Sequence, residues 1–242
     1  MKNSQKPLLI AVPTYNLKNE ILNKARMTGI ENICCTPDLN DYLLSDKLKN
    51  EIDNLYKVGA GEYVLKYLTG QLKTMKKTDS DCQQISCYLD SLKRAYRFDG
   101  HIITTYSMLI HMKQEILDSH KVIIDEDILR TVINTDSVSM EDLKFVGNKG
   151  AFNGAVQSRI NYLCIERGYR KLDKLYISKD DETLKKISSL KSDIYNLLGA
   201  EYVYITTNTI HYLTDNTLPH GKLIILSATA SLELYQMFYL ER

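Results

Sequence analysis

The 242-residue sequence lacks any apolar run that approaches the roughly 20 residues of a membrane-spanning helix. Its N-terminus is not expected to be a secretory leader, because the polar residues 1–7 are followed only by a short apolar run that ends before Pro13. Such a run is typical of a strand. These two absences predict that the protein has no membrane partner and that it is cytoplasmic.

A large charge imbalance and a disulfide framework are absent as well. The chain has 31 Lys and Arg against 30 Asp and Glu, which gives a formal net charge of +1. This balance argues against a strongly basic nucleic-acid coat protein, although a local basic groove is compatible with it. The five cysteines, an odd number in a long chain without a leader, fit free thiols in a reducing compartment.

The apolar residues that are present predict an α/β sheet. The continuous apolar run 8–12 indicates a buried strand, followed by a helix to about residue 27 and a second strand at 30–35. This order is one unit of an α/β fold. Further strands are predicted at 101–105, 121–125 and 222–226, and a hairpin at 201–213.

The segment 38–98 has a different pattern of apolar residues. Its apolar residues recur at helical spacing, with breaks around 59–61 and 77–80. We interpret this segment as a helical insertion within the α/β domain. Helices are also predicted at 108–117, 140–168 and 180–198.

Two of the apolar runs end in polar residues. Residues 122–127 read Val-Ile-Ile-Asp-Glu-Asp, and residues 223–229 read Leu-Ile-Ile-Leu-Ser-Ala-Thr. Each run predicts a buried strand with polar groups at its carboxyl end. Ligands of open parallel sheets bind beyond the carboxyl ends of the strands.

These polar groups suit phosphate chemistry. At a strand end, Asp125 and Glu126 can hold Mg²⁺ and polarise a water. Ser227 and Thr229 on a nearby strand end can sense whether a phosphate is present. A simpler alternative stays open for each run alone, namely a solvated strand end and, for the second run, an N-cap for a helix at 232–238.

Taken in this order, the two runs resemble motifs II and III of superfamily 2 helicases of the DEAD/DEAH type. Residues 10–14, Ile-Ala-Val-Pro-Thr, resemble motif Ia, and residues 102–109 resemble the segment before motif II in the DinG-like, iron–sulfur branch. That branch carries an extra subdomain where 38–98 lies. The resemblance covers nearly the whole chain. It implies a single, incomplete first RecA-like domain over 1–242, an α/β fold of P-loop NTPase type with a parallel sheet flanked by helices.

The resemblance implies a role for each matching residue. Asp125 would bind Mg²⁺, and Glu126 would activate the water that hydrolyses ATP. Ser227 and Thr229 would couple the nucleotide state to domain motion through hydrogen bonds toward the acidic run. The implied enzyme is a helicase-type ATPase, an acid anhydride hydrolase coupled to movement along single-stranded DNA. Such a motor requires the acidic and hydroxyl strand ends to lie side by side.

Six residues are candidates for contacts with single-stranded DNA or RNA. The resemblance supplies four, whose backbone and hydroxyl groups can bond phosphates without reading sequence: Pro13, Thr14, Thr104 and Thr105. Arg167 and Arg170 come from the run 167–171, which interleaves basic and aromatic residues and can contact phosphates and stack bases. A solvated helix end is the simpler interpretation of that run.

The chain departs from the family in two respects. No Gly-x-x-x-x-Gly-Lys-Ser/Thr loop occurs, so nothing recognisable cradles the β- and γ-phosphates of ATP, and the glycines at 147–150 lack the spacing. Ile128 stands where relatives carry His or Asp, which weakens the expected link between hydrolysis and DNA movement. The family would place the missing loop before residue 1 and its second RecA-like domain after residue 242.

Two hypotheses follow. The first is part of an ATP-dependent helicase motor that works with a missing motor half or a partner chain. The alternative is a non-catalytic RecA-like module that binds DNA or a protein partner. A Rossmann-type enzyme is disfavoured because no glycine-rich turn follows the first strand.

The cysteines do not match an iron–sulfur cluster. Relatives with a cluster use four cysteines in the insertion, where this chain offers Cys34, Cys35, Cys82 and Cys87. Cys34 and Cys35 are neighbours on a predicted strand, so their side chains face opposite ways. The spacing of the remaining ligands fits neither a cluster nor zinc, and we expect buried free thiols. The five histidines show no metal spacing.

Overall fold

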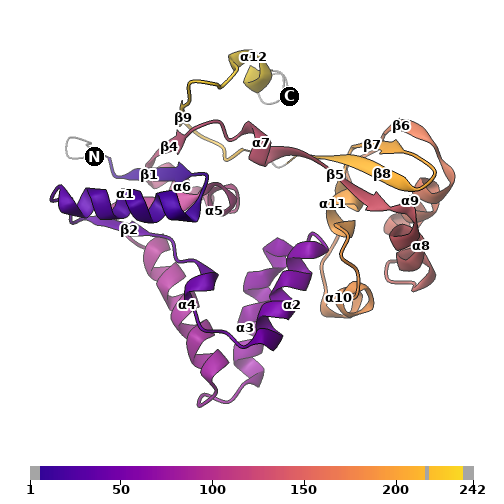
Figure 1. Cartoon of the computed structure of the whole chain (residues 1–242), viewed down its shortest axis with the longest axis horizontal. Helices are drawn as coiled ribbons and strands as arrows, with labels where there is room; N and C mark the ends of the chain where they lie inside the picture. The colour runs from indigo at the N-terminus through magenta and orange to yellow at the C-terminus, as the bar shows by residue number, and fades with distance from the viewer. Residues whose placement is uncertain (1–5, 216–217, 237–242) are drawn as a thin grey trace. The chain divides into compact units, whose positions relative to one another are not determined.

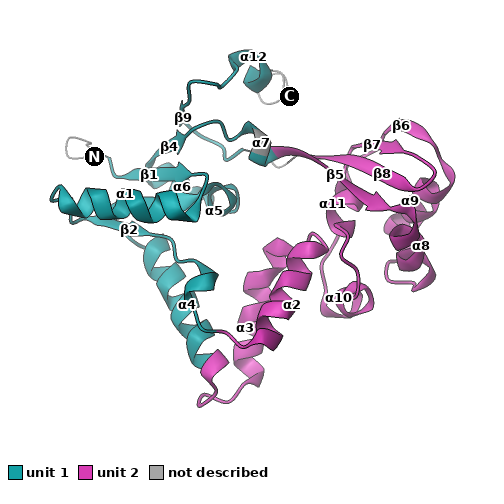
Figure 2. Ribbon diagram, viewed as in Figure 1, with its two compact units in different colours: residues 1–43, 82–132, 216–242 teal, residues 44–81, 133–215 magenta. Residues whose placement is uncertain are grey.

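The computed structural model describes residues 6–215 and 218–236, and the chain divides into two compact units (Figure 2). The first, called here the parallel-sheet unit, comprises residues 1–43, 82–132 and 216–242. The second, the antiparallel-sheet unit, comprises residues 44–81 and 133–215. Each unit is therefore built from separate segments of the sequence.

The parallel-sheet unit contains five strands that run in the same direction. Their order across the sheet is β2 (Ile33–Cys35), β3 (His101–Thr105), β1 (Leu8–Val12), β4 (Lys121–Asp125) and β9 (Leu223–Leu226). All five residues of β1 are buried, as expected for a central strand covered on both faces. The predicted fold class, α/β with a parallel sheet flanked by helices, is confirmed.

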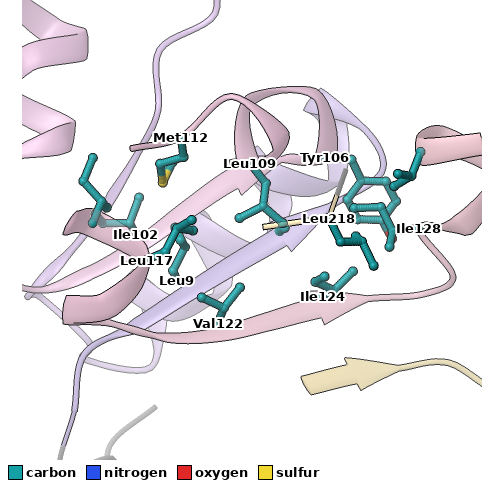
Figure 3. Close-up of a cluster of buried hydrophobic side chains, with 13 residues drawn as sticks. Leu9, Ile102, Tyr106, Leu109, Met112, Leu117, Val122, Ile124, Ile128 and Leu218 are labelled. Atoms are coloured by element: carbon teal, nitrogen blue, oxygen red, sulfur yellow. The ribbon is translucent and has the colours of Figure 1, made fainter. Parts of the chain in front are cut away.

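Helices cover both faces of this sheet. On one face, α1 (Tyr15–Met27) packs through Ala25 and its neighbours against alternate residues of β1. On the other face, α5 (Tyr106–Ile110) and α6 (Gln114–Ser119) enclose a larger apolar cluster that includes Leu9 and Ile124 (Figure 3). The single helix predicted at 108–117 is thus two short helices.

The segment 38–98 is helical, as the spacing of its apolar residues predicts. It forms α2 (Asp46–Lys57), α3 (Val64–Thr74) and α4 (Ser80–Tyr96). These helices are divided between the units, because α2 and α3 belong to the antiparallel-sheet unit and most of α4 belongs to the parallel-sheet unit.

The antiparallel-sheet unit holds a second sheet. Its strand order is β5 (Ile133–Ser139), β8 (Thr209–Asp215), β7 (Tyr202–Ile205) and β6 (Gly168–Lys171). The predicted hairpin is confirmed as β7 and β8. Figure 1 shows α8 (Met140–Asn148), α9 (Gly154–Ile165) and α11 (Ile194–Gly199) on the same side of this sheet.

Two short 3₁₀ helices lie at Leu39–Asp41 and Gly61–Tyr63. Three further short α-helices complete the described elements. They are α7 (Leu129–Val132), α10 (Asp181–Ile187) and α12 (Leu232–Tyr235). The long helix predicted at 180–198 is instead the pair α10 and α11, which residues 188–193 separate. Among the described residues, no helix combines the length and the apolar character needed to cross a bilayer.

The parallel sheet depends on its buried leucines. Leu9 is fully buried, whereas Leu43 in the same unit is 80% exposed. We expect Leu9→Ala to lower the free energy of unfolding by about 2–5 kcal/mol, because it leaves a cavity in the core. Leu43→Ala is the matched control and should change it little. Urea unfolding measures both values, and equal effects of the two variants would contradict this account of the core.

Alkaline pH should destabilise the antiparallel-sheet unit through Tyr63. Burial and a hydrogen bond to Asp181 raise the pKa of this tyrosine to about 12. The unfolded tyrosine ionises near pH 10, so between about pH 10 and 12 the unfolded state loses its proton first and stability falls as pH rises. We expect a shallower fall for Tyr63→Phe in urea unfolding across this range. Identical pH profiles for the two proteins would contradict the assignment.

Candidate functional site

The carboxyl ends of the five parallel strands share one edge of the sheet. Asp125 is the last residue of β4, and its partner in register on β9 is Leu226, which directly precedes Ser227. The acidic and hydroxyl strand ends therefore lie on adjacent strands, as the sequence predicts. On the other side of β4, the strand β1 leads at the same edge into Pro13 and Thr14.

The acidic strand end is a tight turn. The amide of Glu126 donates to the carbonyl of Leu226 at 2.8 Å, which extends the ladder between β4 and β9 by one bond. Glu126 has a φ of 75°, a left-handed conformation that is uncommon for residues other than glycine. Asp125 is half-buried and Glu126 is exposed. The turn thus brings one carboxylate partly out of solvent and leaves the next one in it.

Two tyrosines hold the acidic turn. The hydroxyl of Tyr106 donates to the backbone carbonyl of Asp125, and that of Tyr235 donates to Asp127 Oδ1 at 2.5 Å. Burial, together with the carboxylates nearby, raises the pKa of both tyrosines, which keeps them protonated as donors. Asp127 Oδ1 also accepts the amide of Leu129, so this third carboxylate is a structural cap.

Sequence patterns did not indicate either tyrosine. Tyr106 immediately follows β3, and that position at the carboxyl edge is the one signal that could have identified it. Tyr235 is brought to Asp127 by tertiary structure alone, since the two residues lie 108 positions apart.

The hydroxyl strand end is organised locally. Ser227 Oγ and Thr229 Oγ1 lie 3.2 Å apart, and the amide of Thr229 donates to Ser227 Oγ at 3.1 Å. The N-cap of α12 is a different residue, Ser231, whose side chain accepts from Leu234. The simpler interpretation of Ser227 and Thr229 as helix caps is therefore wrong. Their hydrogen bonds in the structure join them to each other rather than to the acidic turn.

The four residues expected along a nucleic-acid path differ in exposure. Pro13 and Thr14 are exposed, and Thr14 Oγ1 caps α1 by accepting from the amide of Leu17. Thr105 is half-buried at the end of β3. Thr104 is fully buried, with its hydroxyl 3.1 Å from that of Thr36, so it is not presented at the surface.

A buried lysine on α1 contacts the residue that follows β2, near this edge of the sheet. Lys18 on α1 is 2% exposed, donates through Nζ to the carbonyl of Thr36 at 2.6 Å and lies 4.2 Å from the centre of the Tyr15 ring. Burial lowers the pKa of Lys18. This contact ties the first turns of α1 to the end of β2, and no sequence pattern predicted it, because α1 is rich in polar residues.

Ile128 does not reach the edge. It is fully buried in the apolar cluster that also holds Leu9 and Ile124 (Figure 3). The position at which relatives of the proposed family carry His or Asp is thus part of the hydrophobic core in this chain.

Arg167 and Arg170 belong to the antiparallel-sheet unit and are not part of this edge. Arg170 forms an ion pair with Glu166 at 2.7 Å. Arg167 donates to the carbonyl oxygens of three residues at the end of α9: Cys164, Ile165 and Glu166. Both guanidinium groups are therefore engaged in local structure.

Among the residues that the structure describes, no three His, Cys, Asp or Glu side chains converge in a way that could hold a metal ion. Mg²⁺ usually binds proteins through one or two carboxylates and keeps several waters, so Asp125 and Glu126 suit it in number and kind. Burial raises the pKa of the Cys34 thiol to about 12 and that of Cys35 to about 11. These two thiols are therefore poor sources of the thiolate that a metal centre requires.

Comparison with known proteins gives little. No protein-family model matches the chain, and no curated protein matches it. A solved structure described as truncated XPD is similar with a TM-score of 0.46 and 13% sequence identity, over 98% of this chain and 86% of that chain. At this TM-score the similarity supports no assignment of function.

The backbone of Glu126 makes a test of the acidic turn possible. Left-handed φ values cost a residue with a β-carbon roughly 1–2 kcal/mol, and β-branched side chains cost more. We expect Glu126→Gly to preserve or raise the free energy of unfolding and Glu126→Val to lower it by about 1 kcal/mol or more. Thermal or urea unfolding decides the matter, and a Val variant as stable as the Gly variant would show that the turn is not left-handed.

Proposed function

We propose that the parallel-sheet unit is a motor module of helicase type that acts on single-stranded nucleic acid and uses ATP with Mg²⁺. The observation that carries this proposal is the register of β4 with β9, which pairs Asp125 with the residue before Ser227. That register sets a carboxylate pair beside a hydroxyl pair at the edge where parallel sheets bind ligands.

The two carboxylates fit different roles. Asp125, half-buried at the end of β4, is suited to hold a hydrated Mg²⁺. Glu126 is exposed next to it and is suited to orient and deprotonate a water. Ser227 and Thr229 are one strand away, where their hydroxyls could bond a phosphate or the acidic turn.

The residues of this chain do not by themselves fit a nucleotide. No glycine-rich loop is present to surround the phosphates with backbone N–H groups, so no hydrolytic step is assigned to the chain alone. The outer edge of the sheet offers a place for such a loop, because β9 is the last strand and Leu226 is 55% exposed. A further strand that carries the phosphate loop would pair there.

Two observations favour the alternative, a non-catalytic module that binds DNA or a protein partner. The phosphate loop is missing, and Ile128 is buried in the core where a polar residue would be needed at the site. The motor and the DNA-binding form of the alternative both place single-stranded nucleic acid on the same edge, so binding is tested first and turnover second.

Binding is tested at the carboxyl edge. Thr14→Asp keeps the N-cap of α1, because Asp caps as well as Thr, but adds a negative charge where we expect phosphates. We expect about tenfold weaker binding of a fluorescent single-stranded oligonucleotide for this variant and for Thr105→Asp. Thr78→Asp, in an exposed loop, controls for the added charge and should change nothing. Unchanged affinity in the first two variants would show that nucleic acid does not bind at this edge.

Turnover is the second test, and both hypotheses predict the same result for the chain alone. The chain alone should hydrolyse little or no ATP in Mg²⁺. Robust hydrolysis that Glu126→Gln abolishes would overturn the conclusion that the chain lacks a phosphate cradle, and it would exclude the non-catalytic module.

A further inference from the structure

One face of the antiparallel sheet is left uncovered by the described helices of its own unit. Val203, Ile210 and Tyr212 alternate to the other face and are buried. The helices α8, α9 and α11 lie on one side of the sheet (Figure 1). The strand registers place two rows of residues on the opposite face. The first row is Thr135, Leu213, Tyr202 and Lys171, and the second is Ser137, His211, Tyr204 and Tyr169.

Three tyrosines dominate this uncovered face. Tyr169 is 60% exposed and Tyr204 is 55% exposed, although tyrosine is a residue that folding usually covers in large part. The rings of Tyr169 and Tyr202 are stacked, with centroids 6.5 Å apart and an angle of 23° between their planes. Two of the three rings are thus nearly parallel, and those of Tyr169 and Tyr204 are open to solvent.

Within these two rows the one residue with a fixed charge is Lys171. Neither row contains Asp or Glu, whereas Lys171 lies with Nζ 5.4 Å from the centre of the Tyr202 ring and His211 is exposed in the next row. Arg170 alternates to the other face and is ion-paired with Glu166. The two rows thus combine aromatic rings with positive charge and hydroxyl groups.

We infer that this face, the tyrosine face, is a stacking platform for single-stranded nucleic acid. Bases stack on exposed aromatic rings without regard to sequence, and β-sheets that bind RNA use aromatic residues on an open face in this way. Tyr202 and Tyr204 are two residues apart on one strand, roughly 6.6 Å, which offers successive bases separate rings. Lys171, in two rows that contain no Asp or Glu, complements the negative charge of a phosphate backbone.

The tyrosine face would be a second surface that contacts single-stranded nucleic acid. The choice of single-stranded nucleic acid as the ligand rests on the proposed function. The face itself belongs entirely to the antiparallel-sheet unit. The two sets of variants are therefore separable, because Thr14 and Thr105 lie in one unit and the tyrosines in the other.

The test uses the whole chain and fluorescent single-stranded oligonucleotides, one of thymidines and one of uridines, which distinguish DNA from RNA. We expect the double variant Tyr169→Ala, Tyr204→Ala to bind about tenfold or more weakly, because each stacked base is worth about 1–3 kcal/mol. Tyr204→Phe keeps the ring and should bind normally. Tyr56→Ala removes another exposed tyrosine, on α2, and should also bind normally. Circular dichroism confirms that each variant is folded.

Lys171→Gln gives an independent measurement. If Lys171 contacts a phosphate, this variant should reduce the slope of log affinity against log salt by about 0.7. Normal binding by the double tyrosine variant would overturn the inference and leave the proposed function standing. Loss of binding in that variant, together with normal binding by Thr14→Asp, would show that nucleic acid binds at the tyrosine face and not at the carboxyl edge. Self-association that the tyrosine variant abolishes, without any nucleic-acid binding, would assign the face to a second copy of the chain.

Discussion

The candidate site depends on one pairing, that of β4 with β9. These strands come from distant parts of the sequence, and the whole segment 133–215 lies between them. The loss of conformational entropy on closing so long a connection is reduced, because the first and last residues of the segment, Ile133 and Asp215, are partners in the antiparallel ladder of β5 and β8. The chain therefore leaves and returns at nearly the same point, as a short loop would. Because β4 is also paired with β1, a shift of one residue in the β4–β9 register would turn the side chains of β9 to the opposite face.

The parallel sheet was predictable because its strands are buried on both faces and therefore read as continuous apolar runs. The antiparallel sheet was predictable only in its hairpin, where Tyr202–Ile205 alternates strictly. Strand β5 was not predicted, because it is an edge strand and its sequence, Ile-Asn-Thr-Asp-Ser-Val-Ser, is mostly polar. The division of 38–98 between two units has no local signal, since helical spacing shows which face is apolar but not what covers it.

Site residues at strand ends were predictable by a topological rule, and their surroundings were not. The rule that ligands meet parallel sheets at carboxyl ends located Asp125 and Ser227, whose strands are neighbours. Alternation then decides which of two adjacent residues faces solvent. Thr104 is buried while Thr105 is half-exposed, and Arg170 turns to the covered side of its sheet while Lys171 turns to the open side. Sequence alone leaves that choice open until a partner strand fixes it.

The order in which the strands emerge during synthesis has a consequence for folding. Four strands of the parallel sheet are made before residue 126, but the fifth, Leu223–Leu226, is made almost 100 residues later. In the interval β4 has no neighbour on one side, and its unpaired backbone groups can recruit strands from other chains. The antiparallel sheet, whose last strand ends at Asp215, is complete before that gap closes. At this stage a ribosome-bound chain has an unpaired edge on its parallel sheet, whereas its antiparallel sheet is complete. A chaperone would be most needed at this stage.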